Sequence, residues 1–457
     1  MLIEFSVENF LSFKERATLS MVAAKDNALP PNFIRSAQGT NLNLLKSAVV
    51  YGANASGKSN LIDAIRFMRN FLRTSTQNQQ GDTPIKITPF KLDAAMVSKP
   101  STFDITFLWR GVRYNYGFSA DSQYIHREWL FSYEKKKGRM LFERTQKTKK
   151  SEPQFRFSSY WEGERKRLAK RARSQALFLS VAAQFNNKLA DNVMSWFQEW
   201  LKFISWNPAE GSDFFKTCRL IQREAGKKEE IIDFLKQADL GIRDFIVEKV
   251  PIGHLKVKSK LPGKYKKVMK DFDRAVKALD KTLTNVLKEI SKKGSEPYEL
   301  SKNNVITVHE GKDKSGHFMN IPFEFTEESD GTQKFFSLSG LWLDALEKGA
   351  TLVVDELDVR LHSLLTKWLI QTFHKEELNQ KGAQLIFTTH DASLLDKALF
   401  RRDQIWLTEK ESDGATSLYS IWDFKEGKPR KEENLQKGYL AGRFGAIPIL
   451  ESWGNGR

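Results

Sequence analysis

The sequence is poor in cysteine and has no long apolar run. Cys218 is the single cysteine among 457 residues, which excludes an intrachain disulfide. No stretch approaches the roughly 20 consecutive apolar residues that cross a membrane. Residues 1–13 alternate polar and apolar side chains instead of forming the apolar region of a signal peptide. We therefore expect a soluble cytoplasmic protein without a membrane partner.

Internal repeats, coiled-coil heptads and His/Asp clusters with metal-site spacing are also missing from the sequence. The first two absences argue against a solenoid and against a long coiled-coil arm. The third argues against a metal-dependent nuclease site of the chain's own. The roughly 65 residues after His390 are also too few for an added nuclease domain of about 100 residues.

Positive charge, in contrast, is abundant. The formal net charge is +17, which favours an anionic partner such as a nucleotide or nucleic acid over a merely soluble basic surface. Lysine and arginine are concentrated in residues 134–173 and 254–293. Two clusters could bind DNA or RNA phosphates, although a solvated face or an acidic protein partner would explain them too. Their members are Arg165, Lys166, Arg167, Lys170, Arg171 and Arg173, and Lys256, Lys258, Lys260, Lys264, Lys266 and Lys267.

Hydrophobic periodicity predicts an α/β protein with three segments. Residues 1–160 contain strands, a strand–loop–helix unit and an antiparallel β region over 101–130. Residues 161–295 are predicted to be a basic helical insertion, with amphipathic helices over 195–204 and 229–240 and a long helix over 271–290. Residues 296–457 return to strands alternating with helices.

The stretch GANASGKS, residues 52–59, fits the pattern G-x-x-x-x-G-K-[ST] in full. It follows an apolar strand and precedes a helix, which is the context of a phosphate-binding loop. Backbone N–H groups of such a loop surround phosphate oxygens at a helix N-terminus. Lys58 is predicted to reach the β- and γ-phosphates of ATP, and Ser59 to ligate Mg²⁺. The other nucleotide-binding candidates in the loop are Gly52, Asn54, Gly57 and Asn60.

Two later apolar strands end in polar residues. In TLVVDELD the apolar strand is followed by Asp355 and Glu356, and in LIFTTHD the apolar strand is followed, after two threonines, by His390. Carboxyl ends of strands in an open α/β sheet form the ligand-binding edge. We expect Asp355 to hold Mg²⁺, Glu356 to deprotonate the attacking water, and His390 to contact the γ-phosphate or position the water.

These motifs, in this order, resemble those of ATP-binding-cassette ATPases, including the SMC- and RecF-like branch. The resemblance implies a phosphate-loop core with a mixed sheet, an antiparallel β subdomain and a helical insertion. SDGTQ, residues 329–333, looks like the signature loop that contacts the ATP of a partner copy. It implies that Ser329, Gly331 and Gln333 act across a homodimer interface, and that Asp358 couples the two sites.

The chain most resembles compact bacterial ATPases of the RloA and abortive-infection AbiL type, with the AriA subunit of PARIS systems as a more distant relative. The stretches MLIEFSVENFLSFKE, ESDGTQKFF and GRFGAIPIL carry this likeness together with the motifs above. It implies an anti-phage ATPase, in a dimer or a larger assembly, that controls a separately encoded effector, often a TOPRIM nuclease. Leu11 departs from the pattern, because many relatives carry arginine there.

Two matters stay open on the sequence alone. A RecF-like ATPase that binds DNA in repair or maintenance would carry the same motifs. A glutamine joining the sheet to the insertion is not identifiable among Gln77, Gln79 and Gln80, and the stretch TPFKLD, residues 88–93, is an alternative for that junction. The role of residues 438–450 is undecided.

Overall fold

The computed structural model describes residues 1–37, 39–77, 84–133, 138–204, 212–251, 301–424 and 434–448. The chain divides into two compact units, each described here by itself: unit 1 comprises Met1–Glu210 and Leu341–Arg457, and unit 2 comprises Gly211–Gly340. Several predicted features lie outside the described residues, namely the lysines of 256–267, the long helix over 271–290, Gln79 and Gln80. The insertion over 161–295 therefore stays a prediction.

Unit 1 contains a seven-stranded antiparallel sheet with the order β10-β9-β8-β7-β6-β1-β2. The expected hairpins over 101–130 are its central strands β6 to β8. Aromatic residues alternate along them, so that one face is continuously apolar. The strands are β1 (Leu2–Glu8), β2 (Ala17–Ser20), β6 (Ser101–Trp109), β7 (Val112–Ala120), β8 (Ile125–Tyr133), β9 (Arg139–Thr145) and β10 (Gln154–Phe157).

Unit 1 also contains a six-stranded mixed sheet with the order β11-β15-β16-β5-β17-β18. All neighbours in it are parallel except β17 and β18. The carboxyl ends of β5, β15 and β16 therefore lie at one edge. The strands are β5 (Ser47–Tyr51), β11 (Leu201–Ile204), β15 (Thr351–Val354), β16 (Gln384–Thr388), β17 (Ile405–Lys410) and β18 (Thr416–Ser420).

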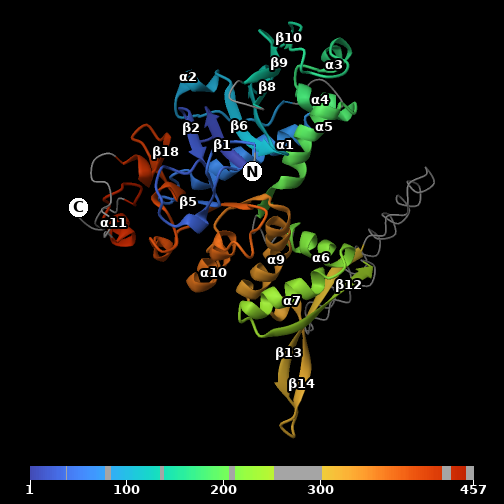
Figure 1. The fold of residues 1–457 in the computed structure, drawn as a ribbon, viewed down its shortest axis with the longest axis vertical. Helices are drawn as coiled ribbons and strands as arrows, with labels where there is room; N and C mark the ends of the chain where they lie inside the picture. The colour runs from blue at the N-terminus through green and yellow to red at the C-terminus, as the bar shows by residue number, and fades with distance from the viewer. Residues whose placement is uncertain are drawn as a thin grey trace, which may run out of the picture. The chain divides into compact units, whose positions relative to one another are not determined.

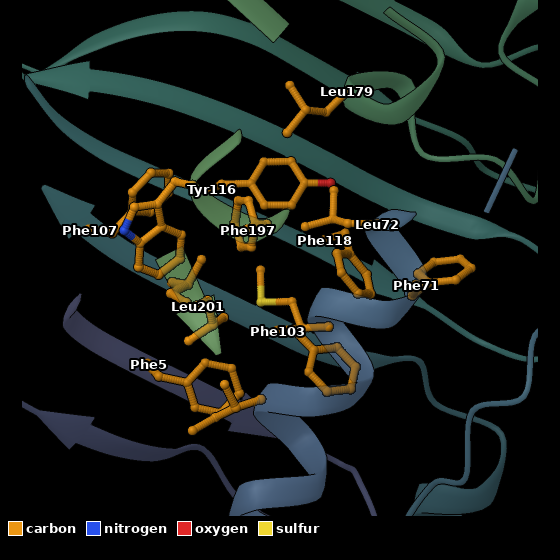
Figure 2. Close-up of a cluster of buried hydrophobic side chains, with 14 of the residues drawn as sticks. Phe5, Phe71, Leu72, Phe103, Phe107, Tyr116, Phe118, Leu179, Phe197 and Leu201 are labelled. Atoms are coloured by element: carbon orange, nitrogen blue, oxygen red, sulfur yellow. The ribbon is translucent and has the colours of Figure 1, made fainter. Parts of the chain in front are cut away.

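Helix α1 (Lys58–Thr74) joins the two sheets into one core. Its residues Leu61, Ile65, Met68 and Leu72 recur at helical spacing and are at most 1% exposed. The cluster they belong to includes side chains from both sheets. Figure 2 shows Phe71 and Leu72 of α1 over the antiparallel sheet, where the Phe71 ring lies 5.4 Å from that of Phe118.

The remaining elements of unit 1 are short and flank the sheets (Figure 1). The helices are α2 (Ala94–Val97), α3 (Lys166–Arg171), α4 (Phe178–Gln184), α5 (Lys188–Ser195), α10 (Ser363–His374) and α11 (Leu435–Leu440). A two-stranded sheet pairs β3 (Phe33–Ile34) with β4 (Leu44–Leu45). The single turns are η1 (Pro30–Asn32), η2 (Trp196–Trp200), η6 (Ala392–Leu394), η7 (Arg402–Gln404) and η8 (Ile421–Asp423).

Unit 2 combines helices with a three-stranded antiparallel sheet of order β12-β13-β14. Its interior is aromatic: the Phe335 ring stacks 5.2 Å from Phe234, and Phe336 lies edge-on to Phe245 at 5.2 Å. The elements are α6 (Ser212–Arg223), α7 (Lys227–Gln237), β12 (Ile242–Pro251), β13 (Ser301–Lys312), β14 (Phe318–Glu324), the turn η5 (Phe325–Glu327) and the first part of α9 (Asp330–Lys348).

The α/β fold class is confirmed, with its phosphate loop between β5 and α1 and its mixed sheet. One predicted helix ends early: residues 195–200 are helical, but Leu201–Ile204 form β11, because the edge of the sheet at β15 supplies their hydrogen-bond partners. Within the segment predicted to be largely helical, Ile242–Pro251 form β12 by pairing with β13. Among the described helices, none is both long and apolar enough to span a membrane.

Candidate functional site

The loop between β5 and α1 has a backbone that only glycine fits at two positions. Gly52 has φ 154° and Gly57 has φ 108°. A Cβ on Gly52 would lie 2.4 Å from the Thr408 carbonyl oxygen, and one on Gly57 would lie 2.3 Å from Thr416 Oγ1. The loop is thus enclosed by β17 and β18, and both glycines are needed for its curled shape.

Lys58, the first residue of α1, is 6% exposed. Its ammonium Nζ donates to the carbonyl oxygens of Gly52 (2.8 Å) and Ala53 (2.9 Å), so the side chain folds back over the loop. Burial lowers the pKa of Lys58, and the charges of Asp355, Glu356 and Asp358 act in the opposite direction. The Lys58 ammonium group therefore lies within the electrostatic influence of these three carboxylates.

The carboxylate of Asp355 follows β15 and lies beside the start of α1. Its Oδ1 accepts hydrogen bonds from Thr388 Oγ1 at 2.6 Å and from Ser59 Oγ at 3.3 Å. Thr388 ends β16 and is fully buried. Its hydroxyl also accepts the backbone N–H of Glu356 at 2.7 Å. One threonine therefore fixes the positions of both acidic residues.

Glu356 and His390 are exposed at this edge of the mixed sheet. Glu356 has φ 51°, a left-handed conformation that is uncommon for a non-glycine residue and recurs at functional sites. The His390 backbone N–H donates to Asp358 Oδ2 at 3.2 Å. The other carboxylate oxygen of Asp358 is buried and has no hydrogen-bond partner among the described residues.

A cavity of about 740 Å³ opens over the loop in unit 1. Of the residues singled out from the sequence, it is lined by Asn54, Gly57, Lys58, Ser59, Asn60, Glu356 and His390. The rest of the wall was not among the predicted site residues; it consists of Leu11, Ser12, Lys410, Gly414 and residues 88–92. The volume of this cavity and its mixture of polar and apolar lining residues fit a nucleotide-sized ligand.

The unpredicted wall is anchored by Asn9, which is 1% exposed. Its Oδ1 accepts the Phe90 N–H at 3.0 Å, and its Nδ2 donates to the carbonyl oxygens of Met96 (2.9 Å) and Lys99 (2.8 Å). The Leu11 N–H donates to the Thr88 carbonyl oxygen at 2.9 Å. The N-terminal stretch VENFLSF thus holds residues 88–92 beside the loop. The family-like Asn-Phe pattern and the stretch TPFKLD, residues 88–93, were the sequence signals that pointed here.

The hydroxyl of Ser12 connects the same stretch to the loop. It accepts from Asn60 Nδ2 at 2.7 Å and from Thr416 Oγ1 at 2.7 Å. In this conformation the Asn60 amide is engaged by Ser12 at the margin of the cavity.

The C-terminal stretch 438–448 lies against this region. The rings of Tyr439 on α11 and Tyr51 on β5 are 5.6 Å apart, and Tyr51 OH donates to the Asp391 carbonyl oxygen at 3.1 Å. Glu409 Oε1 accepts the Ala446 N–H at 3.1 Å. The tail therefore packs against β5 and β17, a placement that the sequence left undecided.

The signature-like stretch belongs to unit 2. Ser329 precedes α9, and its Oγ accepts the Thr332 N–H at 3.2 Å, as a helix N-cap does. Gln333 Nε2 donates to the Glu328 carbonyl oxygen at 2.8 Å. Ser329 is exposed, and Gly331 and Gln333 are half-buried at the start of the helix. These contacts give the stretch a defined shape.

The fold and this loop define a nucleotide-binding ATPase of the phosphate-loop class. A family model described as "AAA domain, putative AbiEii toxin, Type IV TA system" matches residues 47–203 and 215–396, more than half of the chain. The chain belongs to this family.

Among solved structures, one similar chain is the Smc head domain with an extended coiled coil, bound to the C-terminal domain of ScpA, from Pyrococcus furiosus. It is 14% identical, with 92% of this chain and 96% of that chain covered and a TM-score of 0.36. No curated protein matches the sequence.

Proposed function

We propose that the chain binds ATP with Mg²⁺ in the cavity of unit 1 and hydrolyses it, as the ATPase of an abortive-infection defence system. The observation that carries the chemistry is the contact between Ser59 Oγ and Asp355 Oδ1 at 3.3 Å, in front of Lys58. A hydroxyl, a carboxylate and phosphate oxygens are the oxygen ligands that Mg²⁺ prefers.

The donor set fits a magnesium nucleotide. Ser59 and Asp355 would hold the ion, and the loop N–H groups with Lys58 would hold the phosphates. Bound Mg²⁺ supplies charge neutralisation to the phosphoryl group.

Glu356 is the proposed general base. Its backbone N–H is held by Thr388 at 2.7 Å, and its side chain lines the cavity with that of His390. The left-handed backbone of Glu356 turns the chain directly after Asp355. Glu356 accepts a proton from the attacking water, and His390 orients that water or the γ-phosphate.

The catalytic site is proposed to be completed by a second copy of the chain. Ser329, Gly331 and Gln333 stand at the N-terminus of α9, where backbone N–H groups and the helix dipole favour an anion. Asp358 follows the acidic strand and holds the His390 N–H. It has a buried oxygen without a partner among the described residues. We assign Asp358 to coupling between the two sites of such a dimer.

The defence role rests on the family match and on the resemblance of the sequence to abortive-infection ATPases. In this role, the ATP-bound dimer holds a separately encoded effector, such as a nuclease, and hydrolysis releases it.

The test combines two variants with a matched control. Glu356→Gln should lower kcat about 10²–10⁴-fold, the usual contribution of a general base, and accumulate an ATP-bound dimer measured by light scattering. Lys58→Ala should lose ATP binding in calorimetry. Glu376→Gln changes an exposed carboxylate after α10 and should behave as the wild type. A Glu356→Gln variant with wild-type turnover overturns the assignment of the base.

A pull-down in the native gene neighbourhood tests the defence role. Tagged Glu356→Gln protein is held at high ATP and Mg²⁺, and what co-purifies is identified. A stoichiometric protein from an adjacent gene, released by Lys58→Ala, supports control of an effector. Duplex DNA without a protein partner supports the DNA-maintenance alternative and overturns the defence role.

A further inference from the structure

A charged surface away from the nucleotide site lies in unit 1, formed by α3, the start of α5 and the connection between β9 and β10. We call it the basic surface. Its side chains are exposed, and no step of ATP hydrolysis proposed above uses them. The residues that define it are Lys149, Lys150, Arg167, Lys170, Arg171 and Lys188.

Two segments of the basic surface, α3 and the connection between β9 and β10, are fixed to each other by a buried arginine. Arg144 is 0% exposed and donates to the carbonyl oxygens of Arg173 (3.0 Å) and Ala176 (2.7 Å), just after α3. It also donates to Gln146 Oε1 at 3.1 Å, and Gln146 Nε2 donates to the Lys149 carbonyl oxygen at 3.3 Å. The lysines and the helix therefore form one fixed array of positive charge.

The basic surface contains a cavity of about 490 Å³ between α3 and the turn that joins α4 to α5. Asn187 builds its floor: its Nδ2 donates to the Glu162 carbonyl oxygen at 2.8 Å, and its Oδ1 accepts the Ala190 N–H at 3.0 Å. Phe185 lines the cavity and is 45% exposed. The guanidinium carbon of Arg171 lies 4.1 Å from the Phe185 ring centroid.

The same combination occurs a second time in the segment that leads to this cavity. Tyr160 is 51% exposed, and the guanidinium carbon of Arg139 on β9 lies 4.4 Å from its ring centroid. Exposed aromatic rings with stacked guanidinium groups are planar platforms on which unpaired bases stack. Positive charge alone attracts any anion, whereas these platforms select one that also presents flat rings.

We propose that the basic surface binds single-stranded nucleic acid, with phosphates on Lys149, Lys170 and Lys188 and a base stacked at the Arg171–Phe185 pair. Glu164 at the edge of the cavity accepts from Arg167 at 3.2 Å, so Arg167 is not assigned a phosphate contact. An acidic protein partner would use the charge and leave the two aromatic platforms without a role.

The experiment measures binding of fluorescent 20-nucleotide oligo(dT) and oligo(U) to the full chain by fluorescence anisotropy. With the three phosphate contacts named above, the slope of log K against log salt is about −2.1, and affinity falls ~20-fold between 50 and 200 mM salt. Lys170→Glu/Arg171→Glu should weaken binding at least ~10-fold and make the slope shallower by about 0.7, because Lys170 is the phosphate contact that it removes.

The matched control is Lys25→Glu/Lys381→Glu, which changes the net charge equally at exposed positions outside the basic surface and should change affinity less than ~2-fold. Phe185→Ala should weaken binding to oligo(dT) by about 5-fold or more, the effect of one stacked base. Binding of an abasic strand of the same length should be unaffected by this change.

Three results would overturn the proposal: no binding of either oligonucleotide at 50 mM salt, unchanged affinity after the double charge reversal, or equal binding of duplex and single strands with no effect of Phe185→Ala. Preference for one of the two oligonucleotides identifies DNA or RNA as the ligand. The ATPase rate of Phe185→Ala without nucleic acid should equal that of the wild type, so this test is independent of the ATPase assignment.

Discussion

Thr388 is the residue on which the geometry of both acidic side chains depends, so Thr388→Val is the sharpest test of the site. The substitution keeps the shape and removes a hydroxyl that donates to Asp355 Oδ1 at 2.6 Å and accepts the Glu356 N–H at 2.7 Å. Thr388 is 0% exposed, so the Glu356 N–H loses a buried partner. A hydrogen bond to a charged group contributes about 1.5–3 kcal/mol.

If about 1.4–2.8 kcal/mol of that is lost from the transition state, kcat falls about 10- to 100-fold. The Mg²⁺ concentration for half-maximal activity should rise, because Asp355 is no longer oriented. ATP affinity without Mg²⁺ should stay within ~2-fold, because Lys58 and the loop are unchanged. These three quantities are measured by steady-state kinetics with Mg²⁺ titration and by calorimetry.

Thr366→Val is the matched control. Thr366 is equally buried, on α10, and its hydroxyl makes a single bond at 3.4 Å to the His362 carbonyl oxygen. Thr366→Val also replaces a buried hydroxyl by a methyl group, and it should leave kcat unchanged. If Thr388→Val is folded by circular dichroism and retains wild-type kcat and Mg²⁺ dependence, the role of Thr388 as a positioning residue is refuted.

Three further predictions follow from single contacts. Gly57→Ala places a methyl group 2.3 Å from Thr416 Oγ1, at a residue whose φ is 108°. The substitution should lower the free energy of unfolding by about 1–3 kcal/mol and lower the ATP affinity measured by calorimetry. An affinity equal to that of the wild type would show that the loop can relax. Burial lowers the pKa of His374 to about 3. Between about pH 6.5 and about pH 3 the unfolded chain therefore binds one more proton than the folded chain, and the free energy of unfolding should fall by about 1.4 kcal/mol for each unit by which the pH is lowered in that window. Urea titrations should find this slope reduced in His374→Gln. Arg144→Met removes the cation that lies 3.9 Å from the fully buried Glu128 carboxylate. The substitution should lower the free energy of unfolding by about 3–5 kcal/mol. A melting temperature equal to that of the wild type would refute that estimate.

The phosphate loop could be predicted from the sequence because its residues are consecutive. Gly52 to Ser59 form one loop, and the apolar strand before it and the periodic helix after it appear in the same 30 residues. Asp355 and His390 were placed by a general rule, that polar residues after parallel buried strands meet at one edge. The proximity of Ser59 and Asp355, 296 positions apart, follows from that rule and from the strand order.

The rest of the cavity wall, beyond the predicted site residues, was missed because no local pattern encodes it. Lys410 and Gly414 line it from the β17–β18 hairpin, and residues 88–92 are held by Asn9. The same reason explains why the helix predicted over 195–204 is wrong for its last four residues, Leu201–Ile204. Its apolar spacing fits a helix, but an unpaired sheet edge at β15 offered Leu201–Ile204 better backbone partners than another helical turn.

What the sequence determined by itself was therefore the class of chemistry: a phosphate loop, two acidic residues after a buried strand and an α/β core, all written in short, consecutive stretches. The tertiary structure alone decided that Thr388 orients both acids, that Arg144 fixes the basic surface, and that the tail packs against β5 and β17. The physical reason is that these contacts join side chains far apart in the chain, whose meeting depends on the order and register of strands and not on local propensity.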